Sequence, residues 1–174
     1  MIELGVLGFD LVATTPQSPD KETNQLTTNQ LTTNQPNLMA SIFSKIVSGE
    51  ISSHKIAETV DFLAFLDVQP LTMGHVLVIP KKEVDYIFDL DDELYAGLMI
   101  FTRIVAGGLK LAVPCKKVGV AVIGLEVPHA HIHLIPMNRV DDMNFSKAKL
   151  NPTEEELSDM ALKIRENLKS FTES

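Results

Sequence analysis

Short apolar runs and regularly spaced apolar residues alternate along the chain and predict an α+β fold. Four runs bounded by turn residues predict strands, at residues 55–58, 62–66, 75–79 and 118–123. The first two are joined in hairpin fashion at Val60–Asp61. A fifth strand is predicted at residues 127–136, where polar and apolar side chains alternate. We therefore expect a five-stranded antiparallel sheet with helices packed on it.

Three segments have helical character. A short helix is predicted over residues 42–46 and ends at Ser48–Gly49. After the acidic residues 91–93, which suit a helix start, apolar residues recur at helical spacing: Leu94, Leu98, Phe101, Val105 and Leu109. A capping box of Thr153 and Glu156 begins a last helix, whose apolar face is Leu157, Met160, Ala161, Ile164 and Leu168.

The long helix is apolar on a second side as well. That side carries Tyr95, Met99, Ile100 and Ile104. A helix that is apolar all round requires burial on two sides. A second copy of the chain would cover the second side, so we expect a homodimer.

Residues 1–38 differ in composition from residues 39–174. The five residues 24–28 recur as residues 29–33, and no helical or strand period there could bury a face. We expect a disordered extension over 1–38 and one domain over 39–174. We also expect the working protein to begin at Met39.

Composition narrows the class of protein further. With 45% hydrophobic residues, and no apolar run that we expect to span a bilayer, we predict a soluble domain without a membrane partner. A formal net charge of -8 argues against binding to nucleic-acid backbones, which needs clustered Lys and Arg. The single cysteine, Cys115, cannot form an internal disulfide, so we expect the cytoplasm, a reducing compartment.

The most informative residues are three histidines at alternate positions, His129, His131 and His133. On a strand these imidazoles share one face, while Ala130 and Ile132 point to the other. The unperturbed pKa of imidazole lies near neutrality, so such a row either binds a metal or carries out proton and nucleophile chemistry. Successive same-face residues lie about 7 Å apart, so two of the three share a metal more easily than all three.

In the nucleophilic interpretation, the central His131 attacks with one ring nitrogen. The other ring nitrogen donates its proton to a carbonyl oxygen, which selects the tautomer. Like charges nearby lower a histidine pKa, so a neutral attacker can lie beside a protonated neighbour. Imidazole is a good nucleophile toward phosphorus, and the neighbour can protonate the leaving group.

The run His129–Ile135 matches the pattern His-φ-His-φ-His-φ-φ, where φ is apolar. It resembles the signature of the histidine-triad superfamily of nucleotide hydrolases and transferases. Residues 41–51 resemble the opening helix of that family, and residues 65–70 with 74–81 resemble its two central strands. The resemblance covers about residues 39–137.

The resemblance implies a homodimer whose sheets join into one, with a purine nucleotide pocket in each subunit. Asp67 is implied to accept hydrogen bonds from the ribose hydroxyls, and His75 to lie near the triad. The base would be lined by four apolar residues, Ile42, Phe43, Ile46 and Phe65.

The resemblance also implies roles for the three histidines. His131 would form the covalent nucleotidyl intermediate, while His129 and His133 would orient it and contact phosphate. Together these expectations describe a hydrolase of a nucleoside phosphoramidate, or of a related nucleoside 5'-phosphate derivative, that needs no metal or other cofactor. Two alternatives stay open: a nucleotide-binding or scaffold protein with little turnover, and a metal-dependent hydrolase that uses the same histidines.

Three departures from the family pattern concern the phosphate and metal sites. The strand at 118–123 lacks an Asn that many relatives carry, and Leu125 replaces a Gln after Gly124. Glu126 stands where relatives often have a small hydroxyl residue. Ser41 and Ser44 replace two cysteines that bind structural zinc in some relatives, so we predict no zinc there.

Overall fold

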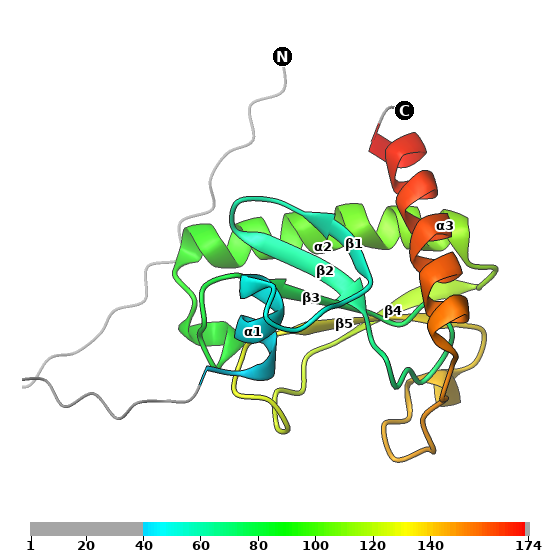
Figure 1. Cartoon of the computed structure of the whole chain (residues 1–174), viewed down its shortest axis with the longest axis horizontal. Helices are drawn as coiled ribbons and strands as arrows, with labels where there is room; N and C mark the ends of the chain where they lie inside the picture. Colours follow the sequence, from blue (N-terminus) through cyan, green and yellow to red (C-terminus); the bar gives the residue numbers. More distant parts are fainter. Residues whose placement is uncertain (1–39, 173–174) are drawn as a thin grey trace, which may run out of the picture. The chain divides into compact units, whose positions relative to one another are not determined.

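The structure, a computed structural model, describes residues 40–172 and consists there of a five-stranded sheet with three helices (Figure 1). The predicted extension over residues 1–38 lies outside the described residues. The elements are α1 (Ile42–Ser48), β1 (Lys55–Glu58), β2 (Phe62–Leu66), β3 (Val76–Pro80), the 3₁₀ turn η1 (Ile87–Asp89), α2 (Asp92–Ala112), β4 (Lys117–Ala121), β5 (Ile132–Met137), the 3₁₀ turn η2 (Val140–Met143) and α3 (Glu154–Thr172).

The sheet is antiparallel throughout, with strand order β1-β2-β3-β5-β4. Its register aligns Phe65 with Leu77, Leu77 with His133, and His133 with Ala121. Directly opposed residues point to the same face of a sheet. His133 therefore lies in the middle of one face, beside an apolar row.

The two faces of the sheet are covered differently, with α1 and α2 on opposite sides (Figure 1). On one face α2 and α3 bury the main core, which includes Val78, Ile132 and Leu134. On the other face the short α1 packs Phe43 and Ile46 against the smaller apolar cluster, formed by Leu63, Phe65, Leu77 and Ile79. Because α1 covers only part of its face, space is left there beside His133.

The predicted placement of all three histidines in one strand is wrong. β5 begins at Ile132, so His129 and His131 lie in the segment that precedes it. The reason is a different set of backbone partners: Ala130 N–H donates to the carbonyl of Val84, outside the sheet. The predicted alternation survives this change, since Ala130 and Ile132 enter the main core.

Other strand boundaries shift by one or two residues. β3 covers residues 76–80 where we predicted 75–79, and β4 ends at Ala121 where we predicted residue 123. Residues 122 and 123 are exposed and make no ladder to β5. The chain turns after them at Gly124, whose φ of 67° is the left-handed conformation that favours glycine.

The predicted helix ends are confirmed in atomic detail. Ser41 caps α1 by accepting a hydrogen bond from Ser44 N–H, and Gly49 ends it with φ 81°. Asp91 caps α2 by accepting from Leu94 N–H. The predicted capping box is present before α3, where Thr153 and Glu156 bond to each other's backbone N–H.

α2 corrects one expectation from composition. By length and composition alone this helix could cross a membrane, contrary to our prediction that no run could. Its residues Leu98, Val105 and Leu109 are completely buried against the sheet and α3, as in the core helix of a globular domain. On its other side Met99 and Ile100 are exposed, so the second apolar face is uncovered in the single chain.

Candidate active site

A cavity of about 390 Å³ opens beside the histidines, on the face of the sheet that α1 partly covers. It is lined by residues from α1, the β2–β3 loop, the loop before the triad and the segment before α3: Ile42, Phe43, Asp67, Gln69, Leu71, His75, Leu77, Ile123, Gly124, Leu125, Glu126, Val127, His131, His133, Phe145 and Lys149. Three histidines and two carboxylates in one cavity mark it as the candidate site.

A larger hollow of about 670 Å³ lies elsewhere on the domain. Its walls include Phe62, Lys81 and Lys82. The two lysines are paired with carboxylates, Lys81 with Glu58 and Lys82 with Asp91. No histidine is among its lining residues in the described part of the chain. We therefore assign the chemistry to the smaller cavity.

His131 is buried at the wall of the cavity and is held in one tautomer. Its Nδ1 donates a hydrogen bond to the backbone carbonyl of His129, at 2.7 Å. A carbonyl oxygen only accepts, so in the neutral ring the proton is on Nδ1 and the lone pair is on Nε2. The rings of Phe43 and His133 pack edge-on against this imidazole, with centroids 5.1 and 4.9 Å away.

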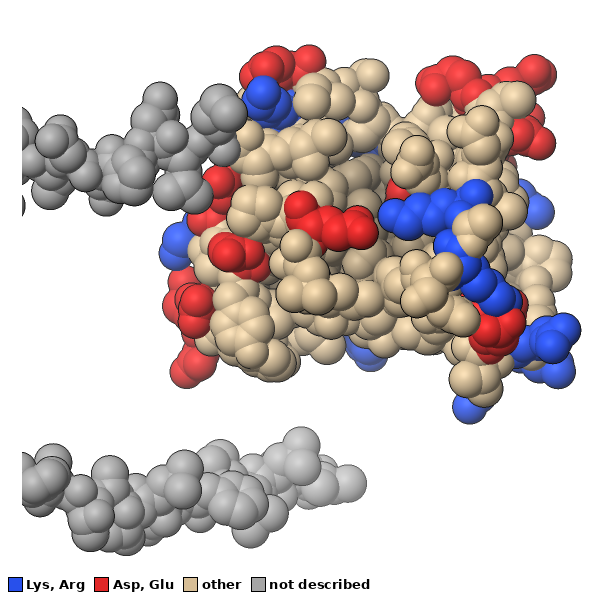
Figure 2. All heavy atoms as spheres, turned by 90° about the horizontal axis from the view of Figure 1, so that it is seen from below, with Lys and Arg blue, Asp and Glu red and all other residues tan. Residues whose placement is uncertain are grey.

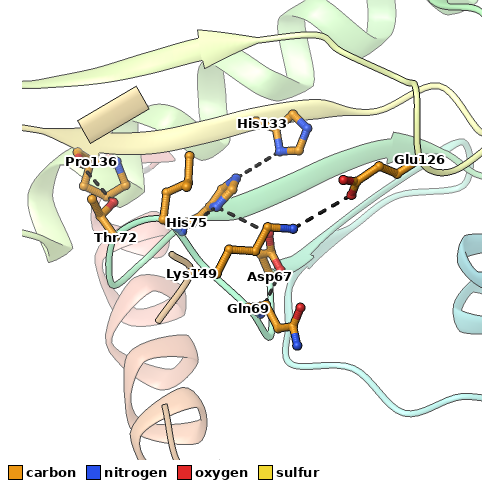
Figure 3. A network of polar contacts seen from close by, with 9 residues as sticks. Asp67, Gln69, Thr72, His75, Glu126, His133, Pro136 and Lys149 are labelled. Carbon is orange, nitrogen blue, oxygen red and sulfur yellow. Dashed lines mark hydrogen bonds and ion pairs between the residues drawn. The ribbon is translucent and has the colours of Figure 1, made fainter. Parts of the chain in front are cut away.

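A chain of polar contacts runs from His133 to His75 and Asp67 (Figure 3). His133 Nδ1 lies 3.0 Å from His75 Nε2, and Leu71 N–H donates to His75 Nδ1 at 3.3 Å. The Leu71 contact makes Nδ1 of His75 an acceptor, so Nε2–H of His75 donates to His133. His133 is then left with its proton on Nε2.

Burial determines the protonation states of His75, His133 and Asp67. It lowers the pKa of His75 to about 3 and, together with the nearby His131, the pKa of His133 to about 4. Burial also raises the pKa of Asp67. Asp67 Oδ2 lies 3.4 Å from His75 Nδ1, but a neutral His75 makes no ion pair with it near pH 7.

His129 lies behind the cavity instead of lining it. Its Nε2–H donates to the carbonyl of Pro80 at 2.8 Å, so its Nδ1 is the acceptor for the Ser41 hydroxyl at 2.9 Å. The ring is completely buried, and burial lowers its pKa. With both nitrogens occupied, His129 orients its neighbours through its backbone carbonyl and its contact with α1. We predicted that His129 contacts phosphate, but both of its ring nitrogens are already hydrogen-bonded in the structure.

The structure brings together most of the predicted binding residues. Ile42, Phe43, Asp67 and His75 all line the cavity. Ile46 and Phe65, which we predicted at the base, do not line it, because both are buried in the apolar cluster beneath α1. Phe65 instead supports Phe43, with ring centroids 5.6 Å apart.

Sequence reasoning missed the side chains that come from the segment before α3. The ring of Phe145 packs on those of His133 and His75, with centroids 5.0 and 6.5 Å away. Lys149 Nζ lies 3.8 Å from Glu126 Oε2. This segment begins after the stretch of family resemblance ends, and nothing in its sequence pattern indicates that it folds back onto the histidines.

Comparison with known proteins assigns the domain. The sequence profile of the HIT domain matches residues 48–140, just over half of the chain. The chain belongs to the HIT family. This confirms the resemblance found in the sequence.

Two similar proteins are an uncharacterized HIT-like protein and an enzyme with a named activity. An uncharacterized HIT-like protein of Borreliella burgdorferi is 33% identical, and the match covers 73% of this chain and 97% of that protein. Adenosine 5'-monophosphoramidase of Saccharomyces cerevisiae is 39% identical over 56% of this chain. This HIT chain spans 62% of the length of the yeast enzyme.

The fold also matches a solved structure that holds zinc. A zinc-bound histidine triad family protein from Mycobacterium smegmatis has a TM-score of 0.64 and 26% identity, over 78% of this chain and 97% of that chain. This raises the question whether the present HIT protein has a zinc site.

The cluster where we predicted no zinc consists of Ser41, Ser44, Glu83 and His129. The Ser44 hydroxyl donates to Glu83 and thereby lowers the pKa of that carboxyl. Structural zinc takes thiolate and imidazole ligands, whereas these hydroxyls are neutral and already paired. The donor set does not fit a structural zinc, and the predicted lack of zinc stays a prediction.

Proposed function

We propose that this HIT protein hydrolyses nucleoside phosphoramidates, or related nucleoside 5'-phosphate derivatives, through a covalent nucleotidyl-His131 intermediate. The observation that carries the proposal is the tautomer of His131: its Nδ1–H is bonded to a carbonyl, so Nε2 is left as the nucleophile at the cavity wall. The similarity to a yeast adenosine 5'-monophosphoramidase supports the substrate class.

The reaction would take two steps. First, a bond forms between His131 Nε2 and the α-phosphorus while the bond from phosphorus to the leaving amine breaks, and the amine takes a proton from the solvent. Second, the oxygen of a water molecule bonds to phosphorus and the bond to His131 breaks, which releases the nucleoside monophosphate. The proton lost by the water returns to the solvent, so the two steps balance. No metal takes part in these steps.

The nucleotide would lie along the cavity from α1 to the triad. Ile42 and Phe43 contribute an apolar wall that suits a purine base. Asp67, whose Oδ1 accepts a hydrogen bond from Gln69 N–H at 2.9 Å, retains Oδ2 for a ribose hydroxyl. This arrangement directs the 5' side of the nucleotide toward His131.

The experiment is hydrolysis of adenosine 5'-phosphoramidate in the presence of a chelator. We expect turnover by the wild-type protein, a decrease in kcat of about a thousandfold or more in His131→Ala, and little change in His54→Ala. His54 is a matched control because it lies outside the cavity, 3.3 Å from Glu154. Equal activity of the two variants would reject the proposal.

Two observations support the alternative functions, and the hydrolysis experiment tests both. Leu125 and Glu126 line the cavity with an apolar side chain and a carboxylate, neither of which binds a phosphate, and this favours a binding protein with little turnover. Ligand atoms of Asp67, His75 and His133 lie within 4.8 Å of one another, close enough to hold a metal. Nucleotide binding without turnover would support the first alternative, and chelator-sensitive turnover restored by one metal would support the second.

We also propose a homodimer with a continuous sheet. β4 is an edge strand of the described sheet, and its Val120 is 51% exposed. The exposed side of α2, with Met99 and Ile100, offers further apolar surface. Light scattering coupled to gel filtration should give twice the mass of one chain, and Ile100→Glu should halve it.

The proposed location is the cytoplasm, with neither membrane nor nucleic acid as a partner. On the face in Figure 2, basic side chains form small groups among acidic ones instead of a continuous basic surface. The formal net charge of -8 agrees with this distribution. Fractionation of cells that express the tagged full-length chain would test the location.

A further inference from the structure

The cavity holds one strongly basic side chain for an anionic substrate. Of its described lining residues, Lys149 is the sole Lys or Arg. His75 and His133 have pKa values of about 3 and 4 and are therefore neutral near pH 7. Asp67 and Glu126 contribute carboxylates. A phosphate that enters this cavity needs a cation, and Lys149 is the candidate.

Lys149 lines the cavity and is directed toward the carboxylates there. Figure 3 shows its side chain extending past His75 toward Asp67 and Glu126. Its Nζ lies 3.8 Å from Glu126 Oε2, and its side chain is 37% exposed. Its positive charge contributes to the lowered pKa values of both His75 and His133.

The backbone around Lys149 is attached to the domain. Leu150 N–H donates to the carbonyl of Pro70 at 2.9 Å, at the β2–β3 loop. At the other end of the segment, Phe145 packs on His133 with ring centroids 5.0 Å apart. Lys149 is therefore presented by a segment fixed at two points. This segment lies beyond residues 48–140, which match the HIT domain.

The segment on the opposite side of the cavity supplies little for a phosphate. Ile123, Gly124, Leu125 and Val127 line that side, and Glu126 is its one polar side chain. Glu126 is a carboxylate, and it repels a phosphate unless its charge is balanced. In the structure its partner is Lys149.

We propose that Lys149 is the phosphate-binding cation of this site, and that Glu126 is its resting partner until an anionic ligand replaces the carboxylate. This inference rests on the proposed nucleotide function and adds a residue outside the HIT domain to it. It predicts that the site discriminates strongly between a nucleoside 5'-phosphate and the matching neutral nucleoside.

The test is calorimetric titration of the full-length protein with AMP and, separately, with adenosine. Lys149→Ala should raise the Kd for AMP about ten- to a hundredfold, because a charge-assisted hydrogen bond to phosphate is lost. The same variant should change the Kd for adenosine less than about twofold. Lys149→Arg, which keeps the charge, should bind AMP nearly as well as wild type.

Lys147→Ala is the matched control. Lys147 is in the same segment but pairs with Asp141 and does not line the cavity. Its removal should leave both Kd values unchanged. If wild type binds AMP and Lys149→Ala weakens it no more than Lys147→Ala, the role of Lys149 is rejected while the nucleotide function stands.

Equal loss of AMP and adenosine binding in Lys149→Ala would also reject the proposal, because the residue would then act on the shape of the site. If wild type binds neither ligand, the proposed nucleotide function fails and the role of Lys149 fails with it.

Discussion

His131 donates its Nδ1–H to the backbone carbonyl of His129, two residues earlier in the chain, at 2.7 Å. The carbonyl can point there because His129 is itself immobilised: one ring nitrogen donates to Pro80 and the other accepts from Ser41. The first histidine of the triad thus acts on the second through its backbone. α1 takes part in this arrangement through its N-cap residue.

Ser41→Ala tests that arrangement. The substitution removes the N-cap of α1 and the nearest donor to the buried Nδ1 of His129, so we expect a loss of about 1–3 kcal/mol in the free energy of unfolding. Urea unfolding measures it. Ser48→Ala is the control, since the Ser48 hydroxyl makes an exposed bond to the carbonyl of Lys45. A loss no larger than that of the control would contradict the account.

The stability of the domain should fall as the pH is lowered from about 6.5 toward 4. The pKa values of His75 and His133 in the folded chain are about 3 and 4, against about 6.5 in the unfolded chain. Between these values the unfolded chain binds more protons, so the stability contributed by each histidine is present above 6.5 and is lost on acidification. The slope is at most about 1.4 kcal/mol per pH unit for each histidine.

Urea unfolding at pH 7 and pH 5 measures this slope. His75→Asn should have a shallower slope than wild type, because one of the two titrating groups is removed. The raised pKa of Asp67 acts in the opposite direction near pH 4, so the comparison stays above pH 5. An unchanged slope in His75→Asn would mean that His75 is not the buried neutral group described above.

Glu126→Gln should improve the use of an anionic substrate. The carboxylate of Glu126 repels a phosphate and also competes for Lys149, from which it lies 3.8 Å. Because Glu126 is 85% exposed, the expected decrease in KM is modest, about two- to fivefold, with kcat nearly unchanged. Steady-state kinetics with adenosine 5'-phosphoramidate measures it. A higher KM would indicate that Glu126 assists binding.

Local sequence patterns predicted most of the fold, because its elements depend on local signals. β1 and β2 match the prediction residue for residue, the helix start at the acidic residues 91–93 is confirmed, and the capping box of Thr153 and Glu156 is present. The start of β5 was wrong because Ala130 bonds to Val84, far along the chain. No alternation of side chains reveals that partner.

The candidate site was predicted only in part, because several of its residues also depend on contacts between distant segments. The spacing of the histidines was enough to find His131 and the carbonyl partner of its other nitrogen. It did not distinguish His129, which turns away from the cavity, from His133, which lines it. Phe145 and Lys149 reach the cavity through tertiary folding of an irregular segment, so their role became visible only in the structure.

The central claim is that His131 becomes covalently bound to the nucleotide. Rapid-quench incubation with adenosine 5'-phosphoramidate labelled in the adenosine, under chelator, tests it most directly. The account predicts an acid-labile nucleotidyl adduct that maps to His131, forms within the first turnover and is lacking in His131→Ala. Turnover by the wild-type protein with no adduct at any quench time, or an adduct on another residue, would contradict it.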